Sequence, residues 1–94
     1  MSLGMLRLLA DPLRWRIVHL LAREQLCTCH LQEELGAKQT LVSHHLRALR
    51  DAGLVETEPC GRFTYYRLAQ GALDAVAAQL GELVAAGEPP KRPC

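Results

Sequence analysis

The sequence predicts a mainly α-helical fold with one small β-hairpin, and three observations support this. Asp11-Pro12 marks the start of an amphipathic helix, because Asp is a strong N-cap and Pro is tolerated at the first helical position. Two further helical segments are joined by a tight turn at Gly36. After Gly53 the hydrophobic pattern changes from helical to alternating. A helix-turn-helix followed by a two-strand ribbon is the winged helix-turn-helix arrangement, here with four helices, the hairpin and a fifth helix.

The first two helices are predicted near the N-terminus. Residues 3–9 are an apolar stretch that we expect to form a short helix. The helix that Asp11 caps runs through about Arg23, and one of its faces is apolar, comprising Leu13, Ile17, Leu20 and Leu21.

The helix-turn-helix follows them. Residues 28–35 form a brief helix, and Gly36 is a suitable residue just after its end. The second helix covers residues 39–52 and ends at Gly53. Its buried stripe has the spacing i, i+4, i+7 and consists of Val42, Leu46 and Leu49.

The wing and the last helix complete the domain. We expect strands at residues 54–58 and 63–68, joined by a turn at residues 59–62. A final helix is expected over residues 69–86. Residues 1–87 are therefore assigned to a single domain for DNA binding and dimerisation, and residues 88–94 to a flexible, proline-rich tail.

The composition narrows the class of protein. A chain of 94 residues fits one domain, and a formal net charge of +1 excludes both a strongly basic tail-like binder and an acidic disordered chain. Hydrophobic residues make up 49% of the chain, but no apolar run approaches the roughly 20 residues of a membrane span. No secretion signal is recognised, so we expect a cytoplasmic protein without a membrane partner. A monomer of this size buries only about 60–70% of its unfolded surface, which favours an oligomer.

The exposed side of the helix at residues 39–52 carries the candidate DNA contacts. His45 lies nearer the buried stripe, so it is expected to contribute less than His44. An ordinary solvated helix face would show the same residue types, so this alternative stays open. The side chains that share the exposed side can hydrogen-bond base edges or phosphates, and they are Gln39, Thr40, Ser43, His44 and Arg47.

Four motifs stand in order between residues 5 and 86. They are ADPLRWRI at 10–17, LCTCHL at 26–31, VSHHLRALRDAGLV at 42–55 and GRFTYYRL at 61–68. Together they resemble the ArsR/SmtB family of metal- and metalloid-responsive repressors, of the arsenical-resistance type. The resemblance implies a homodimeric winged-helix repressor that leaves its operator when an inducer binds. A dimer would match a palindromic operator, because it places two recognition helices one DNA turn apart.

Three positions depart from the pattern of the family. The residue after the Cys-Thr-Cys segment is usually Asp and is His30 here. Many arsenic sensors have a third cysteine where this chain has Gln32, and the cap of the recognition helix is often Ser or Thr where this chain has Lys38. The first two departures leave the ligand set of the inducer open, whereas the third only weakens an N-cap.

Cys27 and Cys29 are the candidate inducer ligands, because thiolates select soft ions and a helix N-terminus favours the thiolate form. Residues i and i+2 of a regular helix point about 200° apart, so a shared ion requires non-helical backbone. Binding is therefore expected to unwind or re-aim the first turn of the helix at residues 28–35. Two small buried hydrophobes would be the alternative to a ligand pair. A disulfide between the two cysteines would be strained, which makes thiol oxidation a secondary hypothesis.

The third ligand stays open. As(III) or Sb(III) takes three sulfurs in a trigonal-pyramidal site, and the other thiols are Cys60 at the expected turn and Cys94 in the tail. Each could instead be an exposed cysteine without a role; of the two, Cys94 is favoured because a tail can reach several places. His30 in place of a sulfur would favour Zn(II), Cd(II) or Pb(II). A different family site, made of Asp and His on the paired C-terminal helices, is disfavoured because Asp74 is alone there.

Two further interpretations concern the wing and the last helix. Arg62 at the wing tip is expected to contact DNA phosphate. A thiol-dependent enzyme is disfavoured, because no activated-nucleophile arrangement with a pocket is recognised. The last helix is expected to dimerise across a twofold axis through Leu73, Val76, Leu80 and Leu83, although a plain core helix of a monomer is the alternative.

Overall fold

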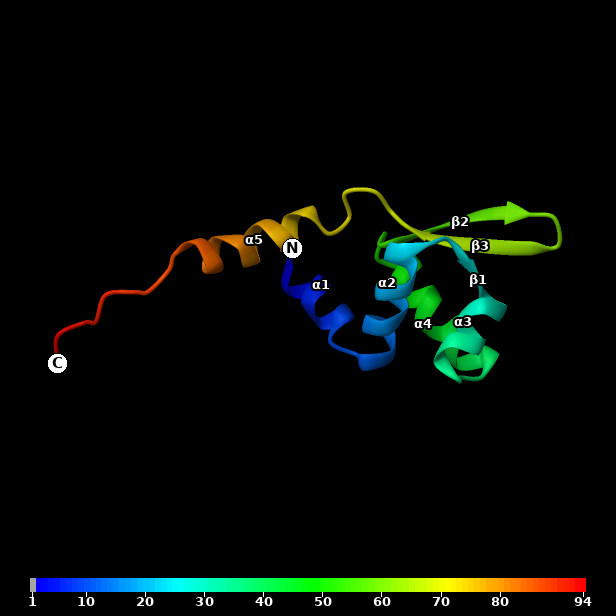
Figure 1. Ribbon diagram of the computed structural model, residues 1–94, viewed down its shortest axis with the longest axis horizontal. Coiled ribbons are helices and arrows are strands. Elements are labelled where there is room, and N and C mark those ends of the chain that lie inside the picture. Colours follow the sequence, from blue (N-terminus) through cyan, green and yellow to red (C-terminus); the bar gives the residue numbers. More distant parts are fainter. Residues whose placement is uncertain (1) are drawn as a thin grey trace.

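The computed structural model describes residues 2–94 and has the predicted winged helix-turn-helix fold, with five helices and a three-stranded antiparallel sheet (Figure 1). The first four helices and the sheet form one body, and the last helix projects away from it, so the molecule measures 63 × 24 × 21 Å. The elements are α1 (Ser2–Leu9), α2 (Pro12–Arg23), β1 (Leu26–Cys27), α3 (Thr28–Leu35), α4 (Gln39–Asp51), β2 (Val55–Cys60), β3 (Phe63–Leu68) and α5 (Asp74–Ala85).

The start of α2 follows from its capping residue. The Asp11 carboxylate accepts hydrogen bonds from the backbone N–H groups of Leu13 at 2.8 Å and Arg14 at 3.1 Å. These two bonds satisfy N–H groups that have no partner inside the helix. The predicted start and end of this helix are both confirmed.

The turn of the helix-turn-helix depends on one glycine. Gly36 ends α3 with φ of 62°, in the left-handed region that a side chain with a Cβ rarely adopts. Its backbone N–H donates to the carbonyl of Gln32 at 2.8 Å. α4 then packs against α2 and α3 through a core whose fully buried side chains are Ile17, Leu31, Val42, Leu46, Leu49 and Leu54.

The wing is a longer hairpin with a tighter turn than expected. The predicted turn at residues 59–62 is wrong, because β2 continues through Pro59 and Cys60, which pair with Thr64 and Phe63. Only Gly61 and Arg62 form the turn, and Gly61 has φ of 61°. Proline is tolerated because β2 is the edge strand of the order β1-β3-β2, where its missing N–H costs no pairing within the sheet.

The strand β1 was not predicted. It has two residues, too few to show an alternating pattern, and it is recognised only by its pairing of Leu26 with Tyr66 and Cys27 with Tyr65. This pairing attaches the chain just before α3 to β3, the central strand of the sheet.

The last helix begins later than the predicted residue 69. A turn with Gly71 at φ of 80° precedes it, and α5 starts at Asp74. Val76 is buried against the body, whereas Leu83 and Val84 are 74% and 81% exposed. Residues 86–94 after α5 contain no further helix or strand. Within residues 2–94, no helix has the length and apolar character to span a membrane.

Candidate nucleic-acid interface and thiolate site

The exposed face of α4 brings the five predicted polar side chains together. One shallow depression on the surface is lined by these residues, which are Gln39, Thr40, Ser43, His44 and Arg47. The opposite face of the helix is buried in the core through Val42, Leu46 and Leu49, as the period predicts. His45 is buried as well, so His44 is the exposed member of the histidine pair. All five side chains of this face are exposed to solvent.

A second depression lies beside the first, between α4 and β3, and it was missed from the sequence. Ser43 and Arg47 line it from α4 together with Arg50, and Tyr66 lines it from β3. Both arginines are exposed. The signal that could have indicated Arg50 is its i+3 spacing from Arg47, whereas Tyr66 is brought there only by the packing of the sheet.

The wing carries cationic and aromatic side chains at its end. Arg62 is exposed in the two-residue turn, and the neighbouring Phe63 is 55% exposed. Farther from the tip, the Arg67 guanidinium donates from Nη1 to Glu58 Oε1 at 2.6 Å and from Nε to Glu56 Oε1 at 3.3 Å. These ion pairs engage the two carboxylates of β2, which leaves Arg62 as the charged group at the tip.

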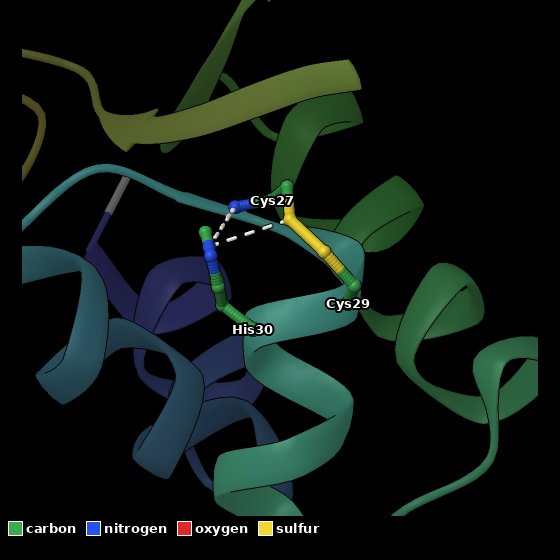
Figure 2. The surroundings of a disulfide bond; sticks show 3 residues. All are labelled: Cys27, Cys29 and His30. Carbon is green, nitrogen blue, oxygen red and sulfur yellow. Dashed lines mark hydrogen bonds between the residues drawn. A yellow bond between two sulfur atoms is a disulfide. The ribbon is translucent and has the colours of Figure 1, made fainter. Parts of the chain in front are cut away.

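The thiol pair lies where β1 meets α3 (Figure 2). Cys27 is the N-cap residue of α3 with extended backbone, φ of −87° and ψ of 171°, and Cys29 is in the first turn of the helix. This agrees with the expectation that the two sulfurs can meet only if the backbone departs from a helix. The two Sγ atoms are joined as a disulfide, with the Cα atoms 5.4 Å apart. Cys27 is 3% exposed, whereas Cys29 is exposed to solvent.

His30 completes a group of three potential ligands. The Sγ atoms of Cys27 and Cys29 and a ring nitrogen of His30 all lie within 4.8 Å of one another. His30 Nδ1 accepts a hydrogen bond from the Cys27 backbone N–H at 3.2 Å and lies 3.3 Å from the Cys27 Sγ (Figure 2). The ring also makes an edge contact with Tyr65 of β3, with ring centroids 5.9 Å apart. Two sulfurs and an imidazole nitrogen are a donor set that suits Zn(II) and Cd(II).

The other two candidate thiols lie elsewhere in this chain. Cys60 is exposed at the end of β2, next to the wing turn, and Cys94 is exposed at the end of the tail. Figure 1 places the C-terminus at the opposite end of the molecule from α3. In the described residues of one protomer, neither thiol joins the group formed by Cys27, Cys29 and His30.

A large apolar surface remains where α1, α2 and α5 meet. An open groove of about 450 Å³ is lined by side chains that include Leu6, Trp15, Leu73 and Leu80. Beyond the groove, α5 exposes Leu83 and Val84. The expectation for this helix is thereby corrected in part, because Val76 is already buried within its own chain, where α5 contacts α1, and Leu73 packs against the core of its own chain.

The sequence of this helix-turn-helix matches a known family. Residues 11–57 fit the family described as bacterial regulatory protein, arsR family. The chain belongs to this family. Its members are regulatory proteins, in agreement with the prediction that the chain is not an enzyme.

The names of two curated relatives refer to resistance to different elements, cadmium and arsenic. A transcriptional repressor SmtB homolog from Synechocystis is 46% identical over 61 residues, covering 65% of this chain and 46% of its own. The cadmium resistance regulatory protein CadC of Listeria innocua is 36% identical over 64 residues, covering 67% and 54%. The arsenical resistance operon repressor of Staphylococcus aureus is 36% identical over 75 residues, covering 80% and 72%. The chain thus spans about half the length of the first two.

Solved structures agree with the fold. A possible transcriptional regulator for arsenical resistance superimposes with a TM-score of 0.72 at 35% identity, covering 89% of this chain and 96% of the other. The homodimeric winged helix-turn-helix DNA-binding domain Mb0332 from Mycobacterium bovis gives 0.69 at 32% identity, covering 85% and 73%.

Proposed function

We propose that this protein is a transcriptional repressor that binds operator DNA as a homodimer and is released when Cys27 and Cys29 coordinate a thiophilic metal or metalloid. One observation carries the proposal. The thiol pair lies at the N-terminus of α3, the first helix of the motif whose second helix, α4, presents the polar face. The site of action would be the cytoplasm, where thiols are kept reduced.

DNA recognition is assigned to α4 and the wing. The side chains of Gln39, Ser43 and Arg47 supply donors and acceptors suited to base edges in the major groove. Arg62 at the wing tip would contact phosphate, which positions the domain without reading sequence. Thr40 and His44 lie on the same face and would contact bases or phosphates at its edge.

Dimerisation is supported by the exposed apolar surface. Leu80, Leu83 and Val84 of α5 are 47%, 74% and 81% exposed, and Leu3 of α1 is 59% exposed. Side chains of this kind are stabilised by an interface that removes them from water. A second copy of the chain, seated on α1 and α5, would cover them and pair two recognition helices for a palindromic site.

As(III) or Sb(III) is the inducer proposed first. The Cys27 and Cys29 thiolates would supply two of its three sulfurs after reduction of the disulfide. Cys94 would supply the third either from a tail folded back over the protomer or from the tail of the second copy, since it lies far from α3 in one chain (Figure 1). Cys60 is the other thiol proposed for this role.

His30 supports Cd(II), Zn(II) or Pb(II) as the alternative inducers. Its ring nitrogen stands beside Cys27 Sγ in the same protomer, so two sulfurs and one nitrogen are available without a second chain. These metals accept mixed sulfur and nitrogen ligands.

The geometry of His30 also supplies a switch. A neutral imidazole has one nitrogen that accepts and one that carries a proton. Nδ1 accepts from the Cys27 N–H, so ligation through Nδ1 would displace that hydrogen bond, and ligation through Nε2 would require a proton on Nδ1. In both cases α3 loses its cap. Because α3 packs on α4 and β1 pairs with β3, the loss would re-aim both DNA-contacting elements.

Thiol oxidation is the second candidate signal, and the Cys27–Cys29 disulfide favours it. Two thiols would lose two protons and two electrons to a peroxide, forming the disulfide and two waters. The disulfide removes both soft donors, so the oxidised protein could not respond to arsenite.

One experiment tests the proposed function. A duplex is selected by the reduced wild-type protein from a random-sequence pool and labelled, and release is then titrated with arsenite, Cd(II), Zn(II) and hydrogen peroxide in separate series. Release by arsenite, Cd(II) or Zn(II) supports the proposal and identifies the inducer class, whereas release by hydrogen peroxide alone supports thiol oxidation as the signal. A pool from which no duplex is enriched, or a complex that none of the four releases, overturns it.

A further inference from the structure

His45 is the one buried polar side chain in the part of the chain that the structure describes. It is 6% exposed and lies on the face of α4 that is otherwise apolar, with Val42, Leu46 and Leu49. An imidazole is unfavourable in such a place unless its nitrogens are hydrogen-bonded.

The partners of His45 belong to the start of α2. Arg14 Nε donates a hydrogen bond to His45 Nδ1 at 2.9 Å. On the other side of the ring, His45 Nε2 lies 3.9 Å from Oδ1 of Asp11, the residue that caps α2. The middle of α4 is thus attached to the first turn of α2 through polar groups, 31 residues apart in the chain.

The donor direction defines the chemical state of the ring. A guanidinium can only donate, so Nδ1 must be the unprotonated nitrogen and Nε2 must carry the proton, which then faces the Asp11 carboxylate. Burial lowers the pKa of His45, the Asp11 charge opposes this, and the Arg14 and His44 charges add to it. The His44 ring is also in edge contact, with centroids 5.3 Å apart. These three groups are the titratable or charged groups facing the ring in the described residues.

We propose that His45 is a positioning residue for DNA recognition: in its neutral form it fixes the rotation of α4 on α2 and so aims Ser43, His44 and Arg47. This inference rests on the proposed role of α4 as the DNA-reading helix. The three aimed residues lie within two positions of His45 on the exposed side, so a rotation of α4 about its axis would displace all of them.

Protonation would remove the attachment. A proton on Nδ1 abolishes the acceptor for Arg14 Nε and places an imidazolium against a guanidinium. Selective binding to the operator should therefore fall in acid. Attraction to phosphate should not fall, because the protein gains positive charge. The ratio of the affinity for the operator to the affinity for unrelated DNA therefore distinguishes the two effects. Loss of positioning lowers this ratio through weaker operator binding, whereas gain of charge strengthens binding to both kinds of DNA.

The test measures this ratio for two duplexes, the one that the reduced wild-type protein selects from a random pool and a scrambled duplex of equal composition. Both affinities are measured between about pH 5 and 8.

For the wild type, the ratio should fall on acidification. His45→Leu, which keeps bulk but not the acceptor, should lower the ratio about tenfold at neutral pH, as expected for one lost hydrogen bond. His45→Asn offers an acceptor near the position of Nδ1 and does not titrate, so it should restore most of the ratio and flatten the profile. His19→Asn is the matched control, since His19 is exposed on α2.

A second measurement can be interpreted even if His45→Leu does not fold. Nitrogen-15 NMR of the histidine rings in the wild type should show His45 with its proton on Nε2 and with a pKa below the ordinary histidine value of 6.5. A proton on Nδ1 of His45 at neutral pH overturns the inference. The inference also fails if His45→Leu has the same affinity ratio as the wild type, or if the ratio of His45→Asn falls in acid as that of the wild type does. If instead no duplex is selected from the pool, the proposed function itself fails, which distinguishes the two.

Discussion

His30 Nδ1 accepts a hydrogen bond from the backbone N–H of Cys27 at 3.2 Å and lies 3.3 Å from the Sγ of the same residue. One nitrogen thus serves the cap of α3 and stands at the edge of the thiol pair. Capping and ligation compete for its single lone pair, and this competition is how the site would transmit inducer binding to α4.

The two roles of His30 are separated by a pair of variants. His30→Gln retains a side chain that can accept from the Cys27 N–H, as Gln does at this position of a capping box, but it removes the imidazole. His30→Ala removes both the hydrogen-bond acceptor and the imidazole. We expect His30→Ala to lower the free energy of unfolding by about 0.5–1.5 kcal/mol and His30→Gln by less, as measured by urea denaturation.

Both variants should bind Cd(II) at least about tenfold more weakly if His30 is a ligand. Arsenite affinity should change little if three sulfurs hold As(III). Equal Cd(II) affinity in wild type and both variants would exclude the nitrogen as a ligand.

Arg47 and Arg62 should differ in the way they affect DNA binding. Arg47→Ala should cost about 1–3 kcal/mol on the selected duplex and relax its sequence preference, if Arg47 reads a base edge. Arg62→Ala should weaken selected and scrambled duplexes alike and reduce the salt slope by about 1, as expected for a phosphate contact. Fluorescence anisotropy at several salt concentrations distinguishes them. Arg23→Ala, with the same charge loss at the exposed end of α2, is the control. Unchanged affinity in both test variants would contradict the docking of α4 and the wing.

Leu80 on α5 should be required for dimerisation. It is 47% exposed and lines the apolar groove, so Leu80→Asp would place a charge in the proposed interface and should give a monomer that no longer binds the selected duplex. Ala78→Asp makes the same charge change on the opposite side of α5 and should leave the dimer intact. Sedimentation equilibrium at micromolar concentration measures both, and a monomeric wild type would refute the interface.

Acid should destabilise the start of α2 through Asp11. The backbone N–H of Arg14 lowers the pKa of Asp11; partial desolvation opposes this, while the Leu13 N–H and the charges of His45 and Arg14 lower it further. Because the folded pKa lies below the ordinary value of 3.8, the stabilisation is fully present above that value and is lost as the pH falls through the folded pKa. Asp11→Asn keeps the cap without the charge and should show a weaker acid loss in thermal unfolding. The same acid dependence in wild type and Asp11→Asn would show that the carboxylate charge contributes nothing.

The helix-turn-helix could be predicted because its signals are local. Asp11 and Pro12 mark one helix start, Gly36 one helix end, and the spacing of Val42, Leu46 and Leu49 the buried side of α4. The exposed face is the side of the helix opposite that spacing, so its five side chains could be predicted from the sequence.

The remaining features depend on contacts between distant segments. β1 is too short to have a period, and its existence depends on Tyr65 and Tyr66 of β3. The burial of Val76 depends on α1, and the attachment of His45 depends on Arg14, 31 residues earlier. No local pattern contains this information. The contact of His30 with Cys27 is an intermediate case, since position N3 of a helix is known to reach its cap.

The central claim is that Cys27 and Cys29 receive the signal that releases DNA. A hydroxyl keeps nearly the size of the thiol but lacks the soft donor, so Cys27→Ser, Cys29→Ser and the double variant should bind the selected duplex as the wild type does. Cys60→Ser and Cys94→Ser show in parallel which thiol completes the site. The decisive measurement is release of the labelled duplex by arsenite from the reduced proteins, followed by anisotropy. The account predicts release from the wild type and none from the double variant, and normal arsenite-driven release from the double variant would contradict it.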